Sequence, residues 1–421
     1  MSTFTSGNIL LPKTADMKKW AVVACDQYTS EPEYWNETAK LTEDAPSALN
    51  LILPELYLED DDVEQRIRKI HSVMNNYITD GIFEEYKDSM IYIERTQFDG
   101  AVRAGIVGCI DLEAYDYRKG SDSPVRATEA TVIERIPPRI KVRKSAALEL
   151  PHIMILVDDA EKTVIEPLEA IKDKLEKVYD FELMQKGGSI KGWLLGKNEQ
   201  SGIEAALSEL SSQKNFDAKY GLSGKKPLVF AMGDGNHSLA TAKEFYEELK
   251  RANPGVDMSN HPARYALVEI VNLHSPALEF EAIHRIVTGV DVYKLMSELT
   301  ARLALTSEKT ECGQSFSCVF GGKHVEANVS APLSKLTVGS LQQFLDEYIA
   351  ENGGKIDYIH GAEVVEKLSE KEGSIGFILP DMKKSELFPT VICDGALPRK
   401  TFSMGHAWDK RYYVECRKIT L

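Results

Sequence analysis

The segment Gly233-Asp234-Gly235-Asn236-His237-Ser238 brings together residue types that could bind a phosphate group. Its glycines would let the backbone turn tightly and approach a ligand closely. The apolar run Pro227 to Met232 predicts a buried strand before the segment, and Leu239 to Arg251 predicts a helix after it. The first N–H groups of a helix have no partner within the helix, so this turn would offer an anion site. Asp234 could hold Mg²⁺, and His237 could contact phosphate or transfer a proton.

Three further segments carry charges suited to phosphate chemistry. In Thr128-Glu129-Ala130-Thr131, a carboxylate stands between hydroxyls, so Glu129 could accept a proton from a substrate hydroxyl. Cations follow it at intervals, and among them Arg139 could neutralise a polyphosphate. The pairs His284-Arg285 and Arg399-Lys400 offer the same kind of charge later in the chain.

Each segment also has a purely structural interpretation. Asn236 or Ser238 could cap an ordinary helix after a tight turn. Thr131 with Glu134 has the spacing of a capping box, and the cations after it could form a solvated face. Arg399-Lys400 could be a charged surface turn. The spacing of residues alone leaves both interpretations open.

Taken in order, these segments resemble one family. Its pattern contains a His-Glu-x-Thr box, an Asp-Gly-His-His-Arg box, a Pro-Thr-His-Arg-Leu-Val segment and a Met-Pro-x-Lys-Ser/Thr motif. The corresponding segments of this chain are Thr128–Thr131, Asp234–Ser238, Ala282–Val287 and Leu397–Thr401. The order and the coverage, from about residue 20 onward, identify the chain as similar to the DUF1015 family.

The Asp-Gly-His-His-Arg box also resembles the nucleotide-phosphate box of free-serine kinases in the ParB/sulfiredoxin-like superfamily. The resemblance implies a nucleotide-dependent phosphotransferase that uses ATP or ADP with Mg²⁺ and acts on a small hydroxylated metabolite, with free serine as the first candidate. Asp234, Gly235 and His237 match the box, whereas Asn236 and Ser238 replace a His and an Arg. This loss of a phosphate clamp favours the alternative, a non-catalytic nucleotide-binding regulatory protein.

The elements that must position these residues alternate between helical and strand periodicity along the whole chain. This alternation predicts a mixed α/β (α+β) fold of two packed domains with mixed sheets, and a ParB/sulfiredoxin-like element around the Asp234 turn. The polar segment Ser212 to Lys226 reads as a linker, so we expect domains at 1–215 and 216–421. We also expect a long helix over Val164 to Tyr179.

The composition and the net charge argue against two classes of partner, nucleic acids and membranes. The chain has 421 residues, 43% hydrophobic and 27% charged, with a net charge of −15. Such an acidic protein repels nucleic acid and anionic lipid, so neither is expected as a partner. No apolar stretch approaches the roughly 20 residues that span a bilayer, and no basic segment followed by an apolar run opens the chain. We therefore expect a cytoplasmic protein, whose oligomeric state the sequence leaves open.

Overall fold

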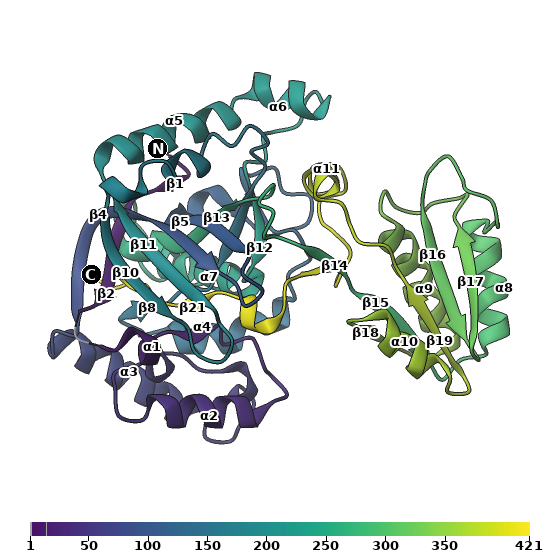
Figure 1. Cartoon of the computed structure of the whole chain (residues 1–421), viewed down its shortest axis with the longest axis horizontal. Coiled ribbons are helices and arrows are strands. Elements are labelled where there is room, and N and C mark those ends of the chain that lie inside the picture. Colours follow the sequence, from purple (N-terminus) through teal and green to yellow (C-terminus); the bar gives the residue numbers. More distant parts are fainter. Residues whose placement is uncertain (1, 14) are drawn as a thin grey trace. The chain divides into compact units, whose positions relative to one another are not determined.

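The computed structural model describes residues 2–13 and 15–421, and the chain divides into two compact units. Unit 1 comprises Met1–Leu278 and Gly405–Leu421, and unit 2 comprises Glu279–Met404. The first strands and the last residues of the chain both lie in unit 1 (Figure 1). Unit 2 is therefore an insertion into the sequence of unit 1, and the C-terminal segment completes the unit in which the chain began.

Unit 1 is built on one large mixed sheet. Across it the strands are β10 (Glu176–Glu182), β11 (Ser189–Leu195), β4 (Phe83–Thr96), β5 (Val102–Asp111), β13 (Tyr265–Asn272), β9 (Met154–Val157), β12 (Phe230–Asp234), β7 (Val125–Arg126) and β6 (Tyr115–Asp116), with β1 (Phe4–Thr5) on β5 and β2 (Gly7–Pro12) on β4. Neighbours are antiparallel except for the parallel pairs β13–β9, β12–β7 and β7–β6. The continuous apolar run of β12 follows from its place inside this sheet, between β9 and β7.

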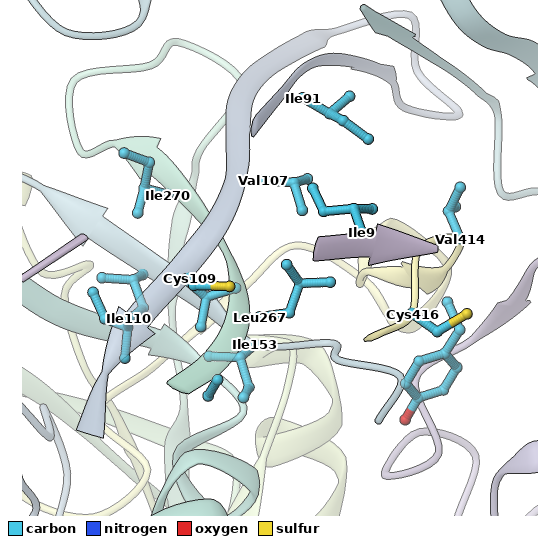
Figure 2. Packing of buried hydrophobic residues seen from close by; sticks show 14 of the residues in the cluster. Ile9, Ile91, Val107, Cys109, Ile110, Ile153, Leu267, Ile270, Val414 and Cys416 are labelled. Carbon is cyan, nitrogen blue, oxygen red and sulfur yellow. The ribbon is translucent and has the colours of Figure 1, made fainter. Parts of the chain in front are cut away.

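The C-terminal segment is held in unit 1 by short strands. β21 (Tyr412–Tyr413) pairs with β3 (Val22–Val23), and β22 (Arg417–Lys418) pairs with β8 (Leu148–Glu149). A further bridge joins Cys416 to Leu10 at the side of β2. Figure 2 shows Val414 and Cys416 in the same hydrophobic cluster as Ile9 and Val107. Residues from both ends of the chain therefore share one core.

Helices cover this sheet. The α-helices of unit 1 are α1 (Met17–Trp20), α2 (Pro32–Thr42), α3 (Val63–Thr79), α4 (Ile136–Arg143), α5 (Lys197–Leu210), α6 (Gln213–Tyr220) and α7 (Asn236–Ala252). Its 3-10 helices are η1 (Ala48–Leu51), η2 (Glu55–Tyr57), η3 (Leu112–Ala114), η4 (Ile133–Arg135), η5 (Glu166–Leu168), η6 (Lys172–Lys174), η7 (Pro262–Arg264) and η8 (Ala407–Asp409). α7 buries Leu239, Ala242 and Tyr246 at helical spacing and packs against α4. Within the described residues, no helix combines the length and the apolar character needed to cross a bilayer.

Unit 2 has a separate, wholly antiparallel sheet. Its strands, in order, are β17 (Lys323–Asn328), β16 (Ser315–Phe320), β19 (Ser374–Ile378), β15 (His284–Thr288) and β18 (Lys355–Ile359). A two-stranded pair, β14 (Phe280–Ala282) with β20 (Phe402–Met404), joins the two ends of the unit. The helices are α8 (Val292–Leu303), α9 (Thr337–Asn352), α10 (Ala362–Ser369) and α11 (Lys384–Asp394).

The mixed α/β fold expected from the sequence is confirmed, but the expected long helix over Val164 to Tyr179 is wrong. The structure has two 3-10 turns, η5 and η6, followed by the edge strand β10. Pro167 lacks the N–H group that a helix would use and disfavours the helical conformation of the residue before it. Val178, Tyr179 and Phe181 instead contribute apolar surface to β10.

The division into units also differs from the boundary expected between residues 215 and 216. The segment Ser212 to Lys226, read as a linker, contains α6, which is capped by Ser212 and buries Phe216. The following strands β12 and β13 pair with β9 and β5, so they belong to the same sheet as the N-terminal half. The chain leaves this sheet only after residue 278.

A buried ionic network ties the C-terminal segment to the central strands. Glu269 of β13 is fully buried and contacts Arg103 Nε at 3.3 Å and an Nη atom of Arg411 at 2.7 Å. Arg411 also binds Glu415, which accepts a hydrogen bond from the Tyr179 hydroxyl. Burial alone would raise the pKa of Glu269, but the attraction of Arg103 and Arg411 outweighs it and lowers the pKa. The network therefore holds an ionised carboxylate within the sheet.

We predict that Glu269→Gln destabilises unit 1. Removing one partner of a buried ionic network leaves uncompensated charge, so the free energy of unfolding should fall by about 3 kcal/mol. The four tryptophans of the chain, Trp20, Trp35, Trp193 and Trp408, all lie in unit 1, so tryptophan fluorescence during denaturation reports on this unit. Glu182→Gln, which breaks the exposed pair with Lys18, is the matched control and should cause no measurable change. Equal stability of the two variants would contradict the structural role of the network.

Candidate functional site

The Asp234 turn lies where a strand ends and a helix begins, as the sequence predicts. β12 ends at Asp234 and α7 begins at Asn236, so Gly235 alone makes the turn, with φ of 78°. A Cβ atom on Gly235 would lie 3.1 Å from the Cα atom of Ile153. Glycine is therefore required twice, for its left-handed conformation and for the close approach of Ile153, the residue before β9. Asp234 Oδ1 accepts a hydrogen bond of 2.9 Å from the Gly235 N–H group.

Two polar atoms near this turn are buried without a partner. Asn236 Oδ1 and Thr131 Oγ1 have no hydrogen-bond partner in the described part of the chain. Buried polar atoms are nearly always hydrogen-bonded in folded proteins. Together with the first N–H groups of α7, which lack partners within the helix, these atoms are suited to meet a polar ligand.

The segment that contains Glu129 lies along the turn. Thr128 Oγ1 donates a 2.8 Å hydrogen bond to the carbonyl oxygen of Met232, the residue before Gly233. The Val132 N–H group donates to His237 Nε2 at 3.4 Å. Glu129 is half-buried between these two contacts. The structure thus places the Thr-Glu-x-Thr box beside the Asp-Gly-x-His box.

Two ion pairs that the sequence analysis did not identify complete the surroundings of the turn. Lys410 Nζ lies 3.3 Å from Asp234 Oδ2. His152 Nε2 lies 3.4 Å from Asp26 Oδ2 and 3.2 Å from Ser238 Oγ, so the second pair reaches the first turn of α7. A carboxylate directly after an apolar run, as in Val22 to Asp26, is the local signal that could have drawn attention to Asp26.

The attraction between Asp26 and His152 favours the charged form of both residues. The hydroxyl of Tyr413 lies 2.8 Å from His152 Nδ1 and accepts a hydrogen bond from the Cys25 N–H group. Burial alone would lower the pKa of His152, but the attraction of Asp26 outweighs it and raises the pKa. Burial would likewise raise the pKa of Asp26, but the charge of His152 holds it well below its usual range. The imidazolium and the carboxylate therefore stabilise each other.

Arg139 belongs to the same region of unit 1. It forms a salt bridge with Glu55 and donates a 2.6 Å hydrogen bond to the Arg135 carbonyl oxygen. Arg139 and Glu55 line a cavity of about 150 Å³ whose wall also includes His152 and Ser238. Arg139 thus lines the same cavity as Ser238 of α7, although its guanidinium group is already paired with a carboxylate.

The other expected phosphate ligands, His284, Arg285, Arg399 and Lys400, lie in unit 2. Arg285 is fully buried, and its guanidinium binds the carbonyl oxygens of Ile283, Arg399 and Lys400. His284 Nδ1 accepts a hydrogen bond from the Leu379 N–H group. Arg399 pairs with Asp346 at 2.5 Å. These contacts stabilise unit 2 itself, and the convergence of the four residues on the Asp234 turn stays a prediction.

The residues around the turn fit a magnesium ion that is bound mainly by its substrate. In the described residues, no group of three or more His, Cys, Asp or Glu side chains is arranged to hold a metal. Mg²⁺ in phosphate-transferring sites is often bound by only one or two carboxylates, with water and phosphate oxygens as the other ligands. Asp234 could supply one such carboxylate, provided that Lys410 moves aside from its 3.3 Å contact.

Solved structures with a similar arrangement share little sequence with this chain. A conserved hypothetical protein from Pyrococcus furiosus is 11% identical, with 74% of this chain and 94% of that chain covered and a TM-score of 0.36. A free serine kinase variant in complex with ADP is 11% identical, with coverage of 74% and 91% and a TM-score of 0.38. SbnI from Staphylococcus aureus is 8% identical, with coverage of 75% and 87% and a TM-score of 0.37.

Among curated proteins, none matches the sequence. A family described as a protein of unknown function, DUF1015, matches residues 10–348. The matched region contains both the Thr128–Thr131 box and the Asp234–Ser238 turn, and it extends from unit 1 into unit 2. The chain therefore belongs to the DUF1015 family.

Proposed function

We propose that this protein is a nucleotide-dependent phosphotransferase that acts on a small hydroxylated metabolite. The observation that carries the proposal is the Gly235 turn, where a helix N-terminus lies beside the Asp234–Lys410 and Asp26–His152 pairs. Phosphoryl transfer requires mainly positioning and neutralisation of charge. A glycine turn, the N–H groups of a helix N-terminus and nearby cations supply both.

Each residue of the turn has a place in this proposal. The N–H groups of Asn236, His237 and Ser238 would bind the phosphates of ATP or ADP. Asp234 would hold Mg²⁺, which when bound supplies positive charge to the phosphate oxygens. Lys410, released from Asp234, would add a second positive charge. Arg139 would serve the same purpose from the cavity wall.

The transfer itself needs a base for the acceptor hydroxyl. The hydroxyl oxygen forms a bond to the terminal phosphorus, the bridging P–O bond breaks, and the shortened nucleotide leaves with the electron pair. The hydroxyl proton passes to a carboxylate, for which we propose Glu129, beside the turn. Asp26 is the second candidate, because its carboxylate reaches Ser238 through His152. Free serine is the acceptor that the family resemblance suggests.

A non-catalytic nucleotide-binding regulator is the alternative. The observation that favours it is Ser238, which stands where the related box has an arginine and whose hydroxyl contacts His152. In that case the turn would bind nucleotide without transfer. Nucleotide binding by the wild type without a phosphorylated product from serine, homoserine or threonine would favour this alternative.

Gly235→Ala should abolish tight nucleotide binding. The alanine Cβ would be forced against the Ile153 backbone at 3.1 Å and would strain the left-handed turn, which displaces the first N–H groups of α7. We expect the Kd for Mg-ATP, measured by calorimetry, to rise at least about tenfold. Gly221→Ala is the matched control, since Gly221 is also left-handed (φ 64°) but nothing lies within 4 Å of an added Cβ. Equal affinities of the two variants for Mg-ATP would contradict the assignment of the Gly235 turn as the phosphate-binding site.

Asp234→Asn should separate binding from chemistry. Asparagine keeps the size of the side chain but loses the charge that would hold Mg²⁺, so charge stabilisation in the transition state is lost. We expect kcat to fall by about 100-fold while the nucleotide Kd changes by less than about threefold. Glu129→Gln and Asp26→Asn, assayed in parallel, identify the base as the variant with the larger loss of kcat. An Asp234→Asn enzyme with wild-type kcat would contradict the assigned role.

The Asp26–His152 pair predicts a pH-dependent stability difference between the wild type and His152→Asn. Because the pKa of His152 is raised on folding, its contribution is complete below the unfolded pKa of about 6.5 and is lost as pH rises through the folded pKa. Because the pKa of Asp26 is lowered, its contribution is present above about 3.9 and is lost as pH falls. The gap in unfolding free energy should be widest between these values and narrow at alkaline pH. The unfolding free energies are measured by tryptophan fluorescence during denaturation. A difference between the two proteins that does not change with pH would show that the pair is not ionised.

A further inference from the structure

The 150 Å³ cavity next to the turn has a lining that the proposed chemistry does not explain. Ser238, His152 and Tyr413 form one hydrogen-bonded cluster in its wall. Most of the other lining side chains are aliphatic, and they come from several separate segments of unit 1. They include Leu51, Leu53, Met74, Val142, Leu148 and Leu150. The cavity thus combines a polar cluster beside the start of α7 with a largely apolar wall.

The arginine and glutamate side chains of the wall neutralise one another. Arg139 forms a salt bridge with Glu55, and Arg143 forms one with Glu149 at 2.5 Å. A zwitterion such as free serine would have to give up the hydration of its ammonium and carboxylate groups here and compete with these pairs for partners. An uncharged apolar group loses little hydration free energy on entering the same cavity, and it gains from contact with the aliphatic side chains.

The volume of the cavity limits the size of the uncharged molecule that could bind there. An apolar cavity of about 150 Å³ in another protein holds one benzene molecule, which has six heavy atoms. A branched chain of four or five carbons with one hydroxyl group has about five or six heavy atoms and is therefore of similar size. Its hydroxyl would lie against the polar cluster, within reach of the Ser238 hydroxyl, and its carbons would fill the aliphatic part of the cavity.

We infer that the cavity is the acceptor site and that it selects a small alcohol with an apolar body of four to five carbons over free serine. This inference rests on the proposed phosphotransferase function for its chemistry, but the binding step requires no nucleotide. The acceptor hydroxyl lies beside Ser238 and His152, next to the phosphate-binding turn. The transfer is then the one described above, with the alcohol oxygen as the attacking atom.

The test uses 3-methyl-1-butanol and serine as probes of the full-length protein without nucleotide. Each missing methylene contact weakens binding several-fold, so 3-methyl-1-butanol should bind at least about tenfold more tightly than serine in calorimetry or ligand-observed NMR. Val142→Phe places a larger side chain in the cavity wall and should remove this binding. Val102→Phe makes the same change at a half-exposed strand position and should leave it intact.

The outcomes separate this inference from the proposed function. Serine binding as tightly as the alcohol, or equal alcohol binding by both variants, would overturn the cavity assignment and leave nucleotide binding untouched. If the protein binds the alcohol but no nucleotide, the result would support the alcohol-binding role of the cavity and contradict the proposed phosphotransferase function. If Val142→Phe fails to fold, Ala146→Leu fills the same cavity with a smaller change and gives the same contrast.

Discussion

The buried contact between Arg411 and Glu269 is the interaction on which the candidate site depends. Glu269 lies on β13 inside the large sheet, whereas Arg411 belongs to the segment that returns to unit 1 after unit 2. Arg411 directly follows Lys410 and stands two residues before Tyr413. Because this contact fixes the backbone of the segment, Lys410 meets Asp234 and Tyr413 meets His152. The charged surroundings of the turn are therefore completed by the last residues of the chain.

The two ion pairs give the site its electrostatic character. Asp234 and Asp26 are each matched by a cation, so the turn carries little net charge in the absence of a ligand. A phosphate would compete with Asp234 for Lys410, and a magnesium ion would take the place of Lys410 on Asp234. The unpaired Asn236 Oδ1 and Thr131 Oγ1 atoms lie on the two boxes that the family pattern shares. Binding of magnesium and phosphate would thus replace the contact between Asp234 and Lys410 with contacts from each residue to the ligand.

The features that the sequence predicts correctly arise from neighbouring residues. The features that it does not predict arise from contacts between segments far apart in the chain. The strand, glycine turn and helix around Asp234 follow from apolar periodicity and glycine placement within about twenty residues, and the structure confirms them. The domain boundary was misplaced because the pairing of β13 with β5 cannot be read from local composition. His152 and Tyr413 meet although they stand 261 residues apart, and no pattern near either residue signals the contact. The burial of Arg285 against the carbonyl oxygens of Arg399 and Lys400 likewise cannot be read from the sequence.

The central claim is that the first N–H groups of α7 bind nucleotide phosphate. Hydrogen–deuterium exchange of the full-length protein, with and without saturating Mg-ADP, tests it most directly. Phosphate bound to the N–H groups of Asn236, His237 and Ser238 must slow their exchange, so protection should be concentrated in peptides that cover Gly235 to Leu239. Unchanged exchange in these peptides at saturating nucleotide, or protection confined to unit 2, would contradict the account.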